Sequence, residues 1–287
     1  MKYAISAATG HLGQGVIRQL QKLVPDTEIV AIVRNSEKAK QLLPTNIEVR
    51  QADYTDQSAM EKALTSIDRL LFISSVPNGD TPRQSQHANV IKAAENAGVQ
   101  YVAYTSFAKA DTATSPLSAD HVATEKMIKE SGLSYSFLRN AWYLENESAY
   151  FKAALAGQNA VYAAGNGKIS YALEREYAEA AADVLVTKNP KRVYEFGGQP
   201  ATYQDLQDAL RKATNNSFSF KSVSDDEYYQ GLIDAGMDQQ FANVLLSMQI
   251  MMRENELNVN SNDLPDVLGH PVASLAEAVQ EVINGLK

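Results

Sequence analysis

The chain has 287 residues, of which 45% are hydrophobic and 21% charged, as in ordinary globular proteins with an apolar core. Its formal net charge is −8 without a run of Lys or Arg, so no general nucleic-acid surface is expected. The absence of cysteine excludes disulfides, thiolate metal sites and cysteine nucleophiles. No apolar stretch approaches the roughly 20 residues of a membrane span. Because Met1 and Lys2 lead directly into a short apolar strand, without a cleavable apolar segment, we expect a cytoplasmic protein.

The first half of the chain alternates between short apolar segments and segments with helical spacing. Strands are expected at Tyr3–Ala7, Glu28–Val33, Ile47–Gln51, Arg69–Ser74, Gln100–Thr105 and Leu133–Leu138. Helices are expected at Leu12–Leu23, Ser36–Leu43, Ser58–Leu64, Arg83–Asn96 and Asp120–Ser131. Apolar strands alternating with helices predict an α/β fold with a Rossmann-type, doubly wound parallel sheet covered on both faces.

The regular alternation breaks down after about Trp142. Helices are expected at Glu147–Leu155 and Glu176–Val186, a strand at Val193–Phe196 that returns to the main sheet, and mainly helix from Thr202 onward. We therefore predict an NADP-binding Rossmann domain over residues 1–142, rejoined by about 176–198. The remainder, residues 143–287, is predicted to form a smaller C-terminal α/β lobe, mainly helical, on the substrate side.

A glycine-containing turn lies between the first predicted strand and the first predicted helix. Ser6–Gly13 follows the pattern G-x-x-G-x-x-G with Ala7 in the place of the first glycine. Small residues here let backbone amides approach a pyrophosphate at the positive end of a helix. Gly10 permits that approach and Gly13 permits close helix–strand packing. Alanine can replace the first glycine of the motif only if the backbone has a negative φ at this position, so we expect a negative φ at Ala7.

The end of the second strand indicates which dinucleotide is bound. An acidic residue about 20 positions beyond the glycines would bind the ribose hydroxyls of NAD. Arg34 stands 21 positions after Gly13 instead, and a guanidinium can bind the 2′-phosphate of NADP through paired hydrogen bonds. We therefore predict NADPH as cofactor, with a solvated arginine after a strand as the alternative.

Other candidate residues follow the remaining strands or lie on one helix. Ligands in such sheets lie beyond the carboxyl ends of the strands, which selects Ser74 and Thr105. Asn140, beside the rings of Trp142 and Tyr143, suits a nicotinamide and a flat substrate, with packing between the lobes as the alternative. His121 shares a helix face with Glu125 and could orient a substrate or belong to a solvated surface. The four histidines share no ligand spacing, so no metal site is expected.

The proton donor of many short-chain dehydrogenases, a tyrosine followed four positions later by lysine, does not occur. None of the fourteen tyrosines has lysine at that offset. Carbonyl reduction to an alkoxide is therefore disfavoured. Hydride addition to a quinone fits better, because the phenolate-like product ionises near pKa ~10, as tyrosine does, and needs little acid assistance.

Several motifs in order resemble one enzyme family. They are Ser6–Gly13, residues 29–35, 51–54 and 103–106, His121–Lys126, Leu138–Tyr143 and residues 268–271. The set resembles the NmrA-like atypical short-chain dehydrogenases, and within them the bacterial type 2 NAD(P)H:quinone oxidoreductases, to which triphenylmethane dye reductases are related. The resemblance implies direct hydride transfer from NADPH without flavin. Ala7 departs from the family's glycine.

The glycine turn, the sheet edge and the resemblance together select the residues of the expected site. Cofactor contacts are expected from Ser6, Ala7, Ala8, Thr9, Gly10, His11, Leu12, Arg34, Phe72, Ile73, Ser74, Thr105, Asn140, Ala141, Trp142, Tyr143 and Arg175. Asn140, Tyr143 and His121 are the candidates for orienting roles in catalysis.

Three functions are consistent with the sequence. The first is an NADPH-dependent quinone reductase acting on a small-molecule quinone. The second changes only the acceptor, to a cationic aromatic dye or another conjugated electrophile, and would need an acidic cleft. The third is a non-catalytic redox sensor that binds NADP and regulates a partner. A homodimer is left open by the sequence.

Overall fold

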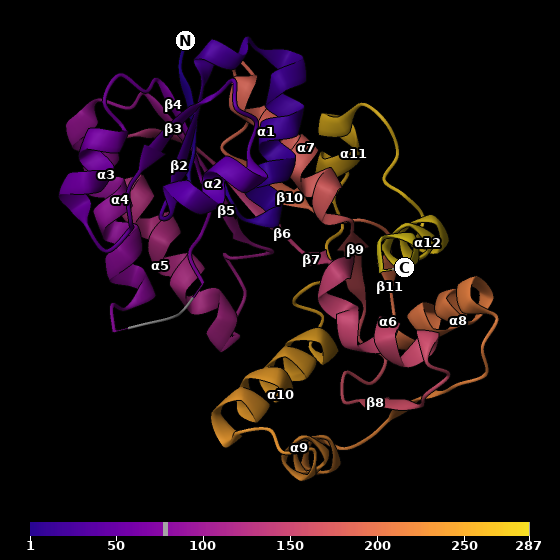
Figure 1. Cartoon of the computed structure of the whole chain (residues 1–287). Coiled ribbons are helices and arrows are strands. Elements are labelled where there is room, and N and C mark those ends of the chain that lie inside the picture. Colours follow the sequence, from indigo (N-terminus) through magenta and orange to yellow (C-terminus); the bar gives the residue numbers. More distant parts are fainter. Residues whose placement is uncertain (77–79, 287) are drawn as a thin grey trace.

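A seven-stranded, fully parallel sheet organises the chain (Figure 1). The computed structural model describes residues 1–76 and 80–286. The strands lie in the order β10-β6-β5-β4-β1-β2-β3. Their bounds are β1 Tyr3–Ile5, β2 Ile29–Val33, β3 Glu48–Gln51, β4 Arg69–Phe72, β5 Tyr101–Phe107, β6 Ser134–Asn140 and β10 Val193–Phe196. The order reverses between β1 and β4, which is the topological switch point where such sheets bind ligands.

Helices cover both faces of this sheet (Figure 1). One face packs against α1 (His11–Leu23), α2 (Ser36–Leu42), α7 (Glu174–Val186) and α11 (Asp263–Leu268). The other packs against α3 (Gln57–Ala63), α4 (Arg83–Ala97) and α5 (Pro116–Glu130). The inner strands β1, β2 and β4 are buried along their whole length, because helices cover them on both sides.

The remaining elements build a smaller lobe around its own apolar cluster. Its elements are β7 (Trp142–Tyr143), a 3₁₀ turn (Leu144–Glu147), α6 (Ser148–Leu155), β8 (Ala160–Tyr162), β9 (Ile169–Ala172), β11 (Pro200–Ala201), α8 (Tyr203–Thr214), β12 (Phe220–Ser222), α9 (Asp225–Asp234), α10 (Gln239–Arg253) and α12 (Leu275–Leu286). Two small sheets, β11-β9-β7 and β12-β8, join these helices. In Figure 1, α9 and α10 lie side by side at the end of the lobe far from the main sheet.

The predicted fold class is confirmed, and so is the return of Val193–Phe196 to the main sheet, where β10 pairs in parallel with β6. The α5 boundary was wrong by one turn. This helix begins at Pro116 rather than Asp120, because Ser115 is its N-cap and a proline is well suited to the first helical position. The short strands of the small sheets were not predicted, since two to four residues are too few to show a period.

Candidate cofactor and active site

The turn after β1 has a backbone conformation different from the one expected. Ala7 has φ +48°, so the expectation of a negative φ is wrong. The turn is nevertheless closed in the manner of a phosphate loop, since the Gly10 amide donates to the Ala7 carbonyl at 3.0 Å. A left-handed alanine costs about 1–2 kcal/mol. The loop therefore contains local strain at a residue whose side chain is exposed.

Gly13 and the start of α1 meet the requirements of a dinucleotide site. A Cβ on Gly13 would lie 2.8 Å from both the Ala7 carbonyl oxygen and the Ala8 Cα, so only glycine permits this packing. The N-cap of α1 is Gly10, which has no side chain to cap the first turn. Amides without a capping side chain, at the positive end of a thirteen-residue helix, are well placed to bind a phosphate.

A cleft of about 530 Å³ opens beside this loop. It is lined by Ala7, Thr9, Gly10, Ile32, Arg34, Lys38, Ala52, Asp53, Tyr54, Thr55, Ser74, Ser75, Val76, Asp80, Thr81 and Gln86. Arg34 and Lys38 place two cations where β2 ends. The Asp53 carboxylate is engaged locally, accepting hydrogen bonds from the Thr55 amide and hydroxyl, both at 2.8 Å. The cleft thus joins the phosphate loop to a cationic strand end.

Several of the predicted cofactor residues lie beneath this cleft and hold its walls together. The Ser6 hydroxyl oxygen accepts hydrogen bonds from the Tyr54 hydroxyl (2.5 Å) and the Ile73 amide (3.0 Å). The Ser74 amide donates to the Thr105 hydroxyl at 2.9 Å. Phe72 is fully buried on the α3–α4 side of the sheet. These residues fix the ends of β1, β4 and β5 relative to one another.

The Asn140–Tyr143 segment forms a second group at the end of β6. The Asn140 side-chain amide donates to the Tyr143 hydroxyl at 3.1 Å. The Asn140 Oδ1 atom is buried and has no hydrogen-bond partner among the described residues. Burial raises the pKa of Tyr143 well above its usual value, so its hydroxyl stays protonated. Trp142 points into the lobe, where its indole N–H donates to Glu147 at 2.9 Å.

Two carboxylates next to Tyr143 were not predicted. The Glu174 amide donates to both Glu145 oxygens, each at 3.0 Å. Burial raises the pKa of both Glu145 and Glu174. Its neighbours His11 and the Leu12 amide, at the start of α1, lower the pKa of Glu174 and so oppose that rise. Both glutamates act to raise the pKa of Tyr143. No local pattern identifies this pair, because only the packing of α7 against α1 brings it to the site.

His121 lies apart from the cleft. It is buried between α5 and the sheet, with Nδ1 3.0 Å from the Tyr104 hydroxyl and Nε2 3.1 Å from an Arg83 nitrogen. Arginine can only donate, so Nε2 accepts and Nδ1 carries the proton. Burial, and then the charge of Arg83, lower the pKa of His121 well below its usual value. His121 also packs against the ring of Phe107, the register partner of Asn140, with ring centroids 5.9 Å apart. Among the described residues it makes no hydrogen bond to Asn140 or Tyr143.

Arg175 also lies apart from the cleft. Its guanidinium pairs with Glu281 on α12, with nitrogen–oxygen distances of 2.6 and 2.9 Å, and about half of each side chain is exposed. Its exposure and this partner place Arg175 on the outer surface between α7 and α12.

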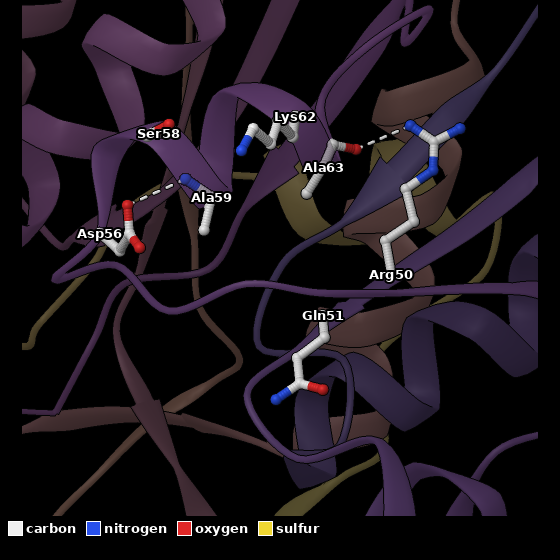
Figure 2. Close-up of a pocket in the computed structure, with 7 residues that line it drawn as sticks. All are labelled: Arg50, Gln51, Asp56, Ser58, Ala59, Lys62 and Ala63. Atoms are coloured by element: carbon white, nitrogen blue, oxygen red, sulfur yellow. Dashed lines mark hydrogen bonds between the residues drawn. The ribbon is translucent and has the colours of Figure 1, made fainter.

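Another hollow, of about 310 Å³, lies between β3 and α3 (Figure 2). Arg50 lines it, but this guanidinium is already bonded to the Ala63 and Thr65 carbonyls, both at 2.7 Å, and to Glu48. Asp56 is occupied as the N-cap of α3, as Figure 2 shows. Arg50 and Asp56 are therefore already engaged, and the hollow shares no lining residue with the cofactor cleft.

Residues 1–76 and 80–286 lack two further features. No cluster of three or more His, Asp or Glu side chains is placed to hold a metal ion. No helix in these ranges combines the length and the apolar character needed to cross a membrane.

Known proteins share this sequence and architecture. Residues 7–153 match the model of an NAD(P)H-binding family. Quinone oxidoreductase 2 of Escherichia coli is 41% identical over 283 residues, which are 98% of each chain. The crystal structure of the E. coli NADPH-dependent quinone oxidoreductase with NADPH superposes with a TM-score of 0.93, covering 98% of this chain and all of that one. Citrobacter triphenylmethane reductase superposes with a TM-score of 0.92 at 34% identity, covering 99% and 100%. The chain belongs to the NAD(P)H-binding family, in the group that contains quinone oxidoreductase 2.

Proposed function

We propose that this protein reduces quinones with NADPH as direct hydride donor and without flavin, as a cytoplasmic enzyme. The observation that carries the proposal is the joining, in one cleft, of an uncapped α1 N-terminus to a strand end that presents Arg34 and Lys38. Similarity to the E. coli quinone oxidoreductase supports the choice of acceptor. The positive end of α1, the glycine that no side chain can replace and the two cations all fit a phosphorylated dinucleotide.

Each part of the cofactor has a counterpart in the chain. The amides at the start of α1 would bind the pyrophosphate, and Arg34 with Lys38 would bind the 2′-phosphate. The unpartnered Asn140 Oδ1 would accept from the nicotinamide carboxamide, which would satisfy a buried acceptor. When bound, NADPH supplies the hydride that reduces the acceptor.

Asn140 and Tyr143 would then stabilise the developing charge on the acceptor. The Tyr143 hydroxyl accepts from Asn140, which leaves its own proton available to the substrate oxygen. Burial keeps that hydroxyl protonated across the neutral pH range. A hydroquinone anion is only about as basic as tyrosinate, with a pKa near ~10, so a hydrogen bond is sufficient and no dedicated acid is needed.

The test is oxidation of NADPH by a small benzoquinone, run beside NADH at matched concentrations. Rapid quinone-dependent oxidation that favours NADPH is the expected result. Tight NADPH binding without oxidation by quinones or dyes would support the sensor function instead. Arg34→Gln is expected to remove the preference for NADPH, and Lys212→Gln, which removes an exposed cation on α8, is its control for a nonspecific effect of charge.

A second acceptor class is favoured by the carboxylates of Glu145 and Glu174 beside Tyr143. When ionised, they would attract a cationic aromatic acceptor such as a triphenylmethane dye, and the similarity to a triphenylmethane reductase supports this. We expect Glu174→Gln to lower kcat/KM for a cationic dye several-fold and to leave neutral benzoquinone almost unchanged. Equal loss for both acceptors would rule out selection by charge.

A further inference from the structure

A hollow of about 680 Å³ lies at the edge of the main sheet opposite the cofactor cleft. Arg69 and Tyr101 are the first residues of β4 and β5, whereas the cofactor cleft lies at the carboxyl ends of the strands. The rim includes Leu133 and Tyr135 at the start of β6, and Lys188 and Arg192 before β10. The quinone reductase function proposed above does not use this hollow.

Arg69 and Tyr101 face each other across neighbouring strands. They are register partners in the β4–β5 pair, and the guanidinium carbon lies 4.0 Å from the centroid of the tyrosine ring. One terminal nitrogen of Arg69 donates to the Thr187 carbonyl at 2.7 Å. The Arg69 Nε and the Tyr101 hydroxyl oxygen are buried, and neither has a hydrogen-bond partner among the described residues. Both residues are only 7% exposed.

Two buried polar groups of this kind, side by side, are unusual. Buried polar groups in proteins are nearly always hydrogen-bonded, so a buried polar atom without a hydrogen bond indicates a missing partner. The Nε–H can only donate. Burial raises the pKa of Tyr101 to about 12, so its hydroxyl also carries a proton at neutral pH and can donate. A single acceptor bound between them satisfies both groups.

The charge around the hollow indicates what kind of acceptor it takes. Within residues 1–76 and 80–286, none of Arg69, Lys188 and Arg192 forms an ion pair within 4.0 Å. The nearby carboxylate, Asp68, accepts from the Lys2 amide at 2.7 Å and from Gln100 at 3.4 Å. Three cations around one hollow contrast with the net charge of −8 of the whole chain.

We propose that this hollow is a second ligand site for a small organic anion that carries an oxyanion on a flat apolar body. The oxyanion is bound by Arg69 Nε–H and the Tyr101 hydroxyl, and Lys188 and Arg192 supply further positive charge. The flat body lies against Tyr135 and Leu133. Arg69 Nε and Tyr101 Oη have almost no exposed area, so the rim side chains shift when the ligand enters. Lys188 and Arg192 are the rim side chains that move, because both are long and exposed.

The proposal is tested by calorimetric titration of 2-naphthoate into the protein saturated with NADP⁺, so that the cofactor cleft is already filled. The wild-type protein is expected to bind the carboxylate and not the uncharged 2-naphthol. Tyr101→Phe removes one donor and is expected to weaken binding about fivefold to tenfold. The double variant Lys188→Gln/Arg192→Gln is expected to weaken it about tenfold, and more at low salt. Lys212→Gln, which removes an exposed cation on α8, is expected to change nothing.

Each contrary result overturns the proposal. Absence of binding at millimolar 2-naphthoate would exclude a site for this class of ligand. Equal affinity in all variants would identify a nonspecific association with the surface. Equal affinity for 2-naphthol would show that the oxyanion is not recognised. Because exposed residues are replaced in the double variant, loss of folding is not expected to obscure the result, and failure of quinone turnover would leave this test intact.

Discussion

Replacing Ala7 by glycine is expected to stabilise the protein, although it removes a side chain. Ala7 holds φ +48° at the turn that precedes α1. The turn cannot relax by reversing this angle, because the Ala7 carbonyl both accepts from Gly10 and packs against Gly13. The strain is therefore imposed by the surrounding structure rather than by the residue itself.

The size of the effect follows from two opposing contributions. A left-handed conformation costs a residue with a Cβ about 1–2 kcal/mol, and glycine avoids this cost. Glycine also gains entropy in the unfolded chain, which lowers stability by about 0.4–1 kcal/mol. The difference predicts that Ala7→Gly raises the free energy of unfolding by about 1 kcal/mol. The KM for NADPH should fall or stay constant, because the Ala7 side chain lines the cofactor cleft.

Guanidinium denaturation measures this change as a rise in the midpoint at constant slope. Ala8→Gly is the matched control, because Ala8 is fully buried and is not among the residues with positive φ. This control loses buried apolar area and gains flexibility, so it should be less stable than wild type. An Ala7→Gly protein destabilised as much as the control would refute the assignment of strain to residue 7.

Three further outcomes are expected. Arg34→Gln should raise the KM for NADPH about 10- to 100-fold with little effect on NADH, measured by steady-state kinetics; equal effects on both would contradict the assigned role. Tyr143→Phe should lower kcat with benzoquinone less than tenfold, with a flat pH–rate profile near neutrality, whereas a loss of about 10²-fold or more would indicate a dedicated acid. Burial raises the pKa of Glu147 from 4.5 to about 7, so the folded protein binds this proton more tightly than the unfolded chain does. The free energy of unfolding therefore falls as the pH rises from 4.5 to about 7. Glu147→Gln should remove up to about 3 kcal/mol of this pH dependence, seen by comparing denaturation at about pH 5 and about pH 8. An unchanged pH dependence would exclude Glu147 as its source.

The sequence was sufficient for the parts of the site that depend on local pattern. Strand–helix alternation predicted the parallel sheet, and a glycine turn after the first strand predicted the position of the phosphate loop. Arg34 could be placed at the end of β2 by counting alone. The residues predicted to hold the cofactor separate into those that line the cleft, such as Thr9, and those that support it, such as Ser6.

The rest depends on contacts between distant segments. The left-handed Ala7 follows from packing against Gly13, which no propensity reveals. Glu145 and Glu174 meet because the Leu144–Glu147 turn of the lobe lies against the first residue of α7. Arg175, one residue further along, points away because Glu281 on a distant helix provides its partner. Long-range charge partners of this kind leave no local signature.

The last strand of the main sheet has a consequence for synthesis of the chain. β10 is added to the edge of β6 only after the intervening lobe segment, and α7 covers α1 from the same late region. A nascent chain that ends near residue 142 therefore exposes the unpaired backbone edge of β6, the kind of surface that aggregates. We expect the ribosome-bound chain to depend on chaperones until Phe196 has emerged, and a fragment truncated before β10 to be insoluble.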